Sequence, residues 1–534
     1  MNGDPRRSQD DDLCNLDDSR MMQNGKRSKL LQPPWQRWLI LGAAALLVCI
    51  GIGAAILVQS GPLTRESVAQ DLRQRLGGKV TIGRFHSSYF PYPKCVAEDV
   101  AVSRSGGGKP LLITITKLTI EPGFSALFTS RIDEVRADGL RVELPAGLGF
   151  NSDEGGFTSS RRWVKEFVAD GSVVEFQRRS PDQQPLRFEI HRLTLGESGS
   201  NTPIQFGGDL VIPEPPGDLR IDGQFGPWRS DDPGATPLSG AYVLQQAKLD
   251  GFRGIAGDLS SQATFHGTLA RLEVNGTTES SNFEVKQSGH PVRLNTRFRA
   301  AVNGTNGDVV LQPVDVVVER TELHSHAILK WRGPDRERKI ALDVSGDGRV
   351  QDLLRLFTRE SPPSMAGAIR LKAAVRLPPG PKPFLRKVVL EGDFMIDGVR
   401  FSKPATEESV DRISIRAQGK NPVKTGKSEG VPGRTRGHVV LGDGTAALSN
   451  LSFEVPGASA QLHGTFNLLN QRVHLSGLLK TEASLSHSTT GIRALLLKPI
   501  QPFFKRKNAG AQIGVSVTGT YGHPSFGLDL DAHK

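Results

Sequence analysis

Motifs that would carry enzyme chemistry are scarce in this 534-residue chain. The spacings H-E-x-x-H and C-x-x-C, which would mark a zinc site and a redox or metal pair, do not occur. A G-x-S-x-G spacing occurs once, at 426–430, but without the strand-to-helix pattern of a serine nucleophile elbow. Gly426, Lys427 and Ser428 have the ending of a phosphate-binding loop. Asn421, however, stands where that loop needs its first glycine, and no strand-to-helix pattern surrounds it. Nucleotide binding is therefore not expected.

Titratable side chains are plentiful, but they do not converge in the sequence. His324 and His326 are two residues apart, so they would share one face of a strand, and no third metal ligand lies near them. We predict an exposed polar face there. Paired carboxylates would serve a glycan hydrolase in a cleft, but an aromatic content of 6% offers little surface for stacking sugars. We therefore predict a protein that is not an enzyme and has no cofactor and no metal.

Period-two alternation of apolar and charged residues is the strongest pattern in the chain. Successive side chains of a strand point to opposite faces of a sheet, so such a strand has one apolar face and one wet face. The pattern occurs at 291–300, 340–344, 368–377, 412–417 and 512–518. The candidates for an apolar lipid-binding face are Val292, Leu294, Phe298, Ile369, Leu371, Val375, Ile413 and Ile415.

Turn and helix signals complete the predicted fold. Asp-Gly and Asn-Gly pairs favour tight hairpin turns, and they occur at 222–223, 250–251, 275–276, 303–304, 397–398 and 443–444. Helices are predicted at 64–76, 161–168, 351–357 and around 491–498. Roughly 25 strands spaced about 4.8 Å apart would extend on the order of 120 Å. The expected fold is mainly β, an elongated, curved antiparallel β-sheet groove with a few short amphipathic helices.

A transmembrane helix is predicted near the N-terminus. Residues 38–58 are all apolar or small, and at about 1.5 Å per residue they would span roughly 30 Å of hydrocarbon. The run is longer than the apolar region of a secretory signal and is poorly suited to cleavage, so we expect it to be retained. Lys26, Arg27, Lys29 and Arg37 precede it closely, which favours a cytoplasmic N-terminus and an exported body.

The remaining composition restricts the partners of such a body. Residues 1–37 are polar and charged, which predicts a disordered cytoplasmic tail. The helix at 64–76 has a narrow apolar stripe and would either pack on the sheet or rest on the bilayer.

Cys95 is the one cysteine of the body, so no disulfide can form within it. A formal charge of +11 suits anionic lipid head groups or envelope polymers, and export excludes nucleic acid.

One segment near the C-terminus combines apolar residues, prolines and cations. Its candidate contact residues are Leu496, Phe503, Phe504, Lys505, Arg506 and Lys507. In one interpretation, a helix in this segment closes the end of the hydrophobic core. In the other, the segment is a tip that touches an anionic membrane surface or a protein partner.

Two regions of the chain resemble the AsmA family of envelope proteins, which are anchored in the inner membrane of Gram-negative bacteria and extend into the periplasm. The first region joins the anchor and the helix after it to the segments 76–83, 111–120 and 124–144. The second lies within 390–530 and includes the phrases FEVPGA at 453–458, LHGTF at 462–466, TTG at 489–491, LKP at 497–499, PFFK at 502–505 and TGT at 518–520. Together these regions cover about half of the chain.

The resemblance implies both an organisation and a function. The expected parts are a tail at 1–37, a transmembrane helix at 38–58, an AsmA-like N-terminal module at 62–150, a β-repeat region at 151–389 and an AsmA-like C-terminal region at 390–534. The expected protein binds or conducts phospholipid in an apolar periplasmic groove and contributes to outer-membrane biogenesis and lipid homeostasis. The alternative is a non-catalytic assembly or scaffold factor for outer-membrane proteins, with an envelope protein as its partner.

Overall fold

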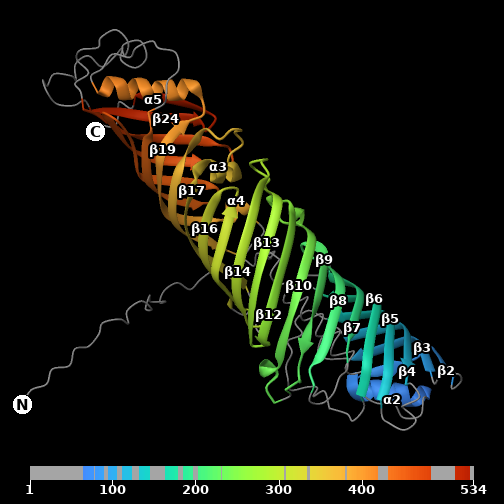
Figure 1. Cartoon of the computed structure of the whole chain (residues 1–534). Helices are drawn as coiled ribbons and strands as arrows, with labels where there is room; N and C mark the ends of the chain where they lie inside the picture. Colours follow the sequence, from blue (N-terminus) through green and yellow to red (C-terminus); the bar gives the residue numbers. More distant parts are fainter. Residues whose placement is uncertain are drawn as a thin grey trace, which may run out of the picture.

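The chain folds into one long, open β-sheet that forms an elongated body (Figure 1). The computed structural model describes residues 64–76, 78–88, 94–104, 111–122, 131–144, 163–177, 185–196, 202–229, 231–305, 308–332, 337–378, 382–418, 431–482 and 512–528. The predicted tail at 1–37 and anchor at 38–58 lie outside these residues. Within the described ranges, no helix combines the length and the apolarity that a membrane crossing requires.

The sheet contains 25 strands in the described part of the chain. They are β1 (Lys79–Thr81), β2 (Arg84–Ser88), β3 (Lys94–Arg104), β4 (Leu111–Glu121), β5 (Arg131–Leu144), β6 (Trp163–Phe176), β7 (Leu186–Leu195), β8 (Ile204–Pro213), β9 (Pro216–Phe225), β10 (Pro237–Lys248), β11 (Ile255–Ala256), β12 (Asp258–Thr268), β13 (Arg271–Val285), β14 (Val292–Val302), β15 (Val309–Val318), β16 (Thr321–Arg332), β17 (Glu337–Arg349), β18 (Met365–Leu377), β19 (Val389–Phe401), β20 (Gly433–Gly442), β21 (Thr445–Val455), β22 (Ala458–Asn467), β23 (Arg472–Thr481), β24 (Gln512–Thr520) and β25 (His523–Leu528).

Pairing follows the order of the chain almost throughout. From β12 onward each strand is antiparallel to the next, and β3, β4 and β5 also pair in sequence. The pair β5–β6 is parallel, and β10 pairs with both β9 and β12. The expectation of a long, mainly antiparallel sheet with few helices is confirmed.

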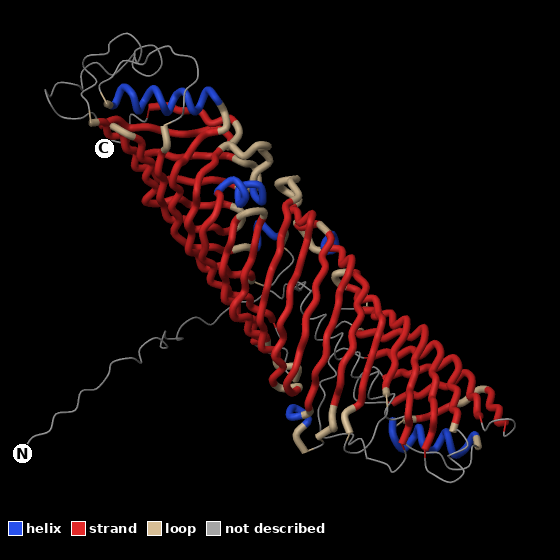
Figure 2. Tube along the Cα trace, viewed as in Figure 1, coloured by secondary structure: helices blue, strands red, loops and turns tan. Residues whose placement is uncertain are grey.

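Helices lie at the margins of the sheet. They are α2 (Arg65–Leu76), α3 (Val350–Phe357), α4 (Phe384–Lys387) and α5 (Pro404–Ala417), with short 3-10 turns η2 (Pro233–Ala235) and η3 (Leu249–Gly251). Figure 2 shows α2 near one end of the body and α5 near the other. The structure confirms the helices predicted at 64–76 and 351–357. The helix predicted around 491–498 lies outside the described residues.

Two predicted elements are of the wrong type. Residues 163–168 belong to strand β6, although Val164, Phe167 and Val168 have helical spacing. Burial of these side chains against the sheet overrides that local pattern. Residues 412–417 are helical, since they end α5, which begins at Pro404, a residue favoured in the first turn of a helix. A short apolar alternation was compatible with either structure.

Three of the six predicted glycine turns are interior to strands. Positions 222–223, 275–276 and 397–398 lie within β9, β13 and β19. Positions 303–304 and 443–444 do connect consecutive strands, and 250–251 lies in η3. A glycine inside a strand marks a bulge or a place where another group comes close to the backbone.

The sheet has two long sides, each formed by a row of turns between strands, and we call these sides its edges. The sheet coils so that the two edges meet in the C-terminal half. Successive turns of an antiparallel sheet alternate between these edges, so the turns β13–β14 and β22–β23 lie on opposite edges. Nevertheless, Gln287 Nε2 donates a hydrogen bond to the Leu469 carbonyl, at 2.6 Å. Gln471 Nε2 likewise donates to the Phe357 carbonyl at 3.0 Å, and Ser364 Oγ donates to the Tyr521 carbonyl at 3.3 Å. We call these three contacts the edge seam.

Candidate functional site

One face of the sheet is apolar across consecutive strands. Directly paired residues share a face, so the register defines continuous rows. One row runs from Val316 through Leu323, Gly346 and Leu371 to Phe394, on β15 to β19. The sequence candidates Val292, Leu294 and Phe298 lie on this face in β14, and Ile369, Leu371 and Val375 lie on it in β18.

The candidates Ile413 and Ile415 do not belong to this face as strand residues. Both lie in helix α5, and Ile413 is 37% exposed. The apolar positions of α5 that pack on the sheet are Val410 and Ala417, next to Phe453 of β21. The correction follows from the helical period, which places residues three to four apart, rather than two apart, on one side.

The covering of the apolar face changes along the sheet. In the N-terminal part, Phe167, Phe188 and Leu193 are fully buried, with 0% exposure. They belong to one large cluster that runs from Ala69 of α2 to Phe265 of β12. There the side chains of the apolar face pack against one another, and the interior is filled.

From β13 onward the same face is only partly covered. Leu294, Phe298, Leu371, Val375 and Phe394 are all partly exposed. The buried residues of this region are divided among small clusters, one of them formed where α3 packs against β18 and β19. The C-terminal half therefore presents apolar side chains that the described residues do not cover completely.

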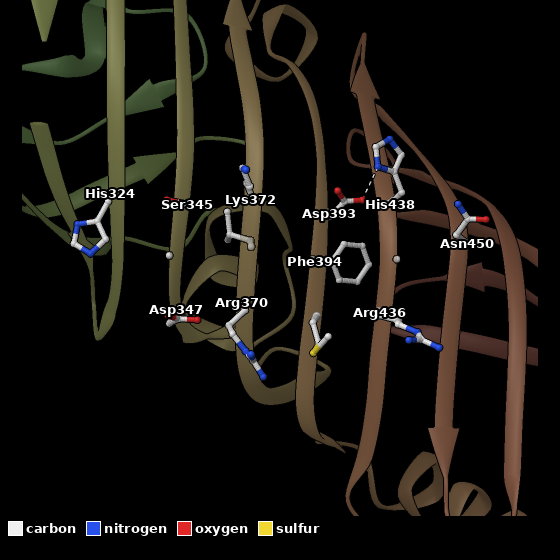
Figure 3. A pocket seen from close by; sticks show the side chains of 14 residues that line it. His324, Ser345, Asp347, Arg370, Lys372, Asp393, Phe394, Arg436, His438 and Asn450 are labelled. Atoms are coloured by element: carbon white, nitrogen blue, oxygen red, sulfur yellow. Dashed lines mark hydrogen bonds and ion pairs between the residues drawn. The ribbon is translucent and has the colours of Figure 1, made fainter. Parts of the chain in front are cut away.

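The wet face carries charged side chains in register across several strands. Around His324, Lys372, Asp393, Arg436 and His438 these side chains line an open recess of about 700 Å³ (Figure 3). Most of its lining residues come from polar rows, and Gly346, Leu371, Phe394 and Gly437 come from the apolar row. The charges are largely paired with each other, as expected for a solvated face.

Two histidines that line the recess have carboxylate partners. His324 Nδ1 lies 2.8 Å from Asp315 Oδ1, and His438 Nδ1 lies 2.8 Å from Asp393 Oδ1. Ser345 is paired in register with His324, so aspartate, histidine and serine stand in one row. No hydrogen bond joins His324 to Ser345 among the described residues, and His324 is 60% exposed. The row therefore lacks the contact that would activate a serine nucleophile.

Metal ligands also fail to converge. No group of three or more histidine, cysteine, aspartate or glutamate side chains is arranged to hold a metal ion within the part of the chain that the structure describes. His324 and His326 share the wet face, as their spacing predicted, and His326 is paired in register with Asp343.

One ion-pair group of the wet face joins three residues. Asp397 accepts hydrogen bonds from Arg434 Nε at 2.8 Å and from Arg370 Nη2 at 2.9 Å. These hydrogen bonds lower the pKa of the Asp397 carboxyl below its ordinary value, Arg434 having the larger effect. The group links β18, β19 and β20 on the side of the sheet opposite to the apolar row.

No family model, curated protein or solved structure matches this chain. The AsmA resemblance therefore stays a prediction. The segment with Leu496, Phe503, Phe504, Lys505, Arg506 and Lys507 lies outside the described residues.

Sequence reasoning missed one recurrent feature of the apolar face. Gly223 is paired with Phe206, Gly240 with Phe265, Gly276 with Phe298 and Gly437 with Phe394. The glycines at 223 and 276 were expected in turns. A signal was present at these two positions, because Gly223 and Gly276 stand in segments of alternating apolar and polar residues, where a tight turn would break the alternation.

Proposed function

We propose that the protein binds the acyl chains of phospholipid on the apolar face of its C-terminal half, from β13 to β24. The observation that carries the proposal is the partial exposure of a face that is apolar and in register over many strands. Soluble proteins rarely leave a large contiguous apolar surface exposed unless it binds something. A ligand with long hydrocarbon chains matches the extent of this face, whose rows through Leu294, Leu371 and Phe394 carry serine and threonine but no charged side chain.

The energetic reason for such a surface is simple. Each methylene moved into water costs about 0.8 kcal/mol, so two acyl chains with some 30 methylenes face a barrier of order 20 kcal/mol. An apolar face lowers this barrier without any chemistry. The proposal therefore includes no catalytic residue, cofactor or metal.

The proposed setting is the bacterial envelope. In it, residues 38–58 cross the inner membrane once, the N-terminus is cytoplasmic and the body lies in the periplasm. The support is the apolar length of 38–58 and the cations before it. The physiological role would be outer-membrane biogenesis and lipid homeostasis, as the AsmA resemblance suggests.

The filled N-terminal part restricts where the ligand lies. Phe167, Phe188 and Leu193 occupy the apolar face there completely, and displacing such side chains would cost several kcal/mol. The proposal therefore assigns lipid to the strands after β12. In this proposal the apolar face of strands β3 to β9 is filled by side chains and binds no lipid.

Site-specific photocrosslinking in cells tests the proposal. A photoreactive residue in place of Leu294, Leu371 or Val375 should capture phospholipid. The matched controls are Arg297 and Arg370, which lie on the same two strands but on the wet face. Equal capture on both faces would contradict the proposal.

The same experiment addresses the alternative of an assembly or scaffold factor. Phe526 of β25 is 52% exposed, and β25 pairs only with β24 among the strands that the structure describes. An exposed strand edge is a common site for adding a partner's strand. Crosslinks from Phe526 to an outer-membrane protein, without lipid capture at Leu371, would favour the scaffold function.

A further inference from the structure

Glycines on the apolar face lie beneath phenylalanine rings of neighbouring strands. A Cβ added to Gly223, Gly240 or Gly276 would lie 2.7 to 2.8 Å from the Cζ atom of the opposite phenylalanine. At Gly437 the corresponding distance to Phe394 Cζ is 3.1 Å. Each ring therefore reaches across to the next strand and covers its glycine.

Backbone conformation does not explain these four glycines. None of them has a positive φ, although 13 other glycines of the described residues do. Close approach is the remaining reason for a residue without a side chain. Figure 3 shows the Phe394 ring between the ribbons of β19 and β20, near the backbone of β20.

The consequence is a thin aromatic wall, by which we mean phenylalanine rings that lie over glycines of the apolar face. A phenylalanine that stood away from the sheet would fill the space above the apolar face, as large side chains do in small barrels. A ring that lies over a glycine adds apolar surface but occupies little depth. Phe206 and Phe265 are 5% and 7% exposed, so their pairs belong to the filled interior. Phe298 and Phe394 are partly exposed, and there the paired glycine permits an aromatic wall that leaves the face accessible.

We propose that the ring-over-glycine pairs of the partly open half, Gly276 with Phe298 and Gly437 with Phe394, set the depth available to ligand, and that Gly437 determines whether the face accepts a lipid with two acyl chains or only one. This inference rests on the proposed lipid-binding function. Gly437 is the decisive position because the neighbours of its added Cβ are the flexible ends of Phe394 and Leu451, both about 3.1 Å away. At Gly276 the added Cβ would also meet the Gln262 carbonyl oxygen at 2.6 Å, so a substitution would disturb the backbone.

The test compares two glycines of strand β20. Gly437→Val forces the Phe394 ring away from the wall, whereas Gly442→Val is the matched control because nothing lies within 4 Å of its added Cβ. Each full-length variant carries a photoreactive residue at Val375 and is exposed to vesicles that contain phosphatidylethanolamine and lysophosphatidylethanolamine. In Gly437→Val, we expect capture of the two-chain lipid, phosphatidylethanolamine, to fall at least fivefold and capture of the one-chain lipid to stay unchanged. Gly442→Val should capture both lipids as the wild type does.

Other outcomes separate the two proposals. If the wild type captures neither lipid at Val375, the proposed function fails. If the wild type captures the two-chain lipid and Gly437→Val captures it equally well, the inference fails while the function stands. If Gly437→Val melts at a lower temperature than the wild type, the Phe394→Leu variant tests the inference instead, since it removes the ring and adds no atoms at Gly437. It should raise two-chain capture, and an unchanged ratio of the two lipids would overturn the inference.

Discussion

Gln287 and Leu469 are 182 residues apart in sequence and lie at turns on opposite edges of the sheet, yet the amide of Gln287 donates to the carbonyl of Leu469. This contact, with those of Gln471 and Ser364, requires the sheet to coil. Near the same turns, Val285, Leu441 and Leu468 form one buried cluster. The edge seam thus combines directional hydrogen bonds with apolar packing, and it fixes the curvature of the proposed lipid-binding half.

Removal of the Gln471 side chain should weaken the edge seam. Gln471 is 8% exposed, and its amide donates to the carbonyls of Phe357 and Leu468. Gln471→Ala leaves these acceptors without that donor, so the free energy of unfolding should fall by about 1–3 kcal/mol. Urea unfolding of the purified protein measures the change. Gln461→Ala, at an exposed position of β22, is the control and should stay within about 0.5 kcal/mol of the wild type. An equal effect of both substitutions would show that the seam contributes no specific stability.

Two phenylalanines should differ sharply in their contribution to stability. Phe188 of β7 is 0% exposed and packs edge-on against Phe176, with ring centroids 5.7 Å apart. Phe188→Ala creates a cavity in the filled part of the interior and should destabilise the protein by about 3–5 kcal/mol. Phe526→Ala, at 52% exposure, should cost less than about 1 kcal/mol. Thermal unfolding of both variants provides the comparison, and similar losses would mean that the N-terminal part is not packed as described.

The Asp397 group should make stability depend on acid pH. The folded-state pKa of Asp397 is lowered from the ordinary value of 3.8, chiefly by the hydrogen bond from Arg434 and then by that from Arg370. A carboxyl with a lowered folded-state pKa stabilises the folded state above its unfolded-state pKa, and the stabilisation is lost as the pH falls through the lowered value. Asp397→Asn should therefore melt below the wild type at pH 6, and the two melting temperatures should converge below pH 3.8.

A neighbouring carboxylate provides the control for that pH series. Asp347 lies on β17, is exposed and forms no ion pair among the described residues. Asp347→Asn breaks no ion pair, so at pH 6 it should lower the melting temperature less than Asp397→Asn does. A difference between wild type and Asp397→Asn that stays constant from pH 6 to pH 2.5 would contradict the linkage argument.

The thiol of Cys95 should be unreactive while the protein is folded. Cys95 is 1% exposed, and burial raises its pKa to about 11. At pH 8 only about one such thiol in a thousand is ionised, and the thiolate is the reactive form. In a Cys14→Ser, Cys49→Ser variant, Cys95 is the only cysteine. Maleimide should label it slowly in the native protein and rapidly in 6 M guanidinium, as followed by mass spectrometry. Rapid labelling in the native protein would place Cys95 outside the core.

Much of the fold was predictable from local pattern. The alternations at 291–300 and 368–377 predicted β14 and β18 with the correct apolar face, because strand geometry forces every second side chain to the same side. The helix at 351–357 was equally clear from its spacing. Failures occurred where a short segment fits two periods, as at Ile413 and Ile415, or where burial overrides a helical spacing, as at Phe167.

The sequence by itself determined the alternation of apolar and charged residues, and with it a long antiparallel sheet with one apolar face. Such information is local, because it depends on residues two positions apart. Only the tertiary structure decided that Gly276 lies beneath Phe298, that Gln287 meets Leu469, and that the interior is filled near Phe188 but partly open near Leu371. These relations arise from register, twist and coiling, which sum small rotations over many strands and so bring together residues that no local pattern connects.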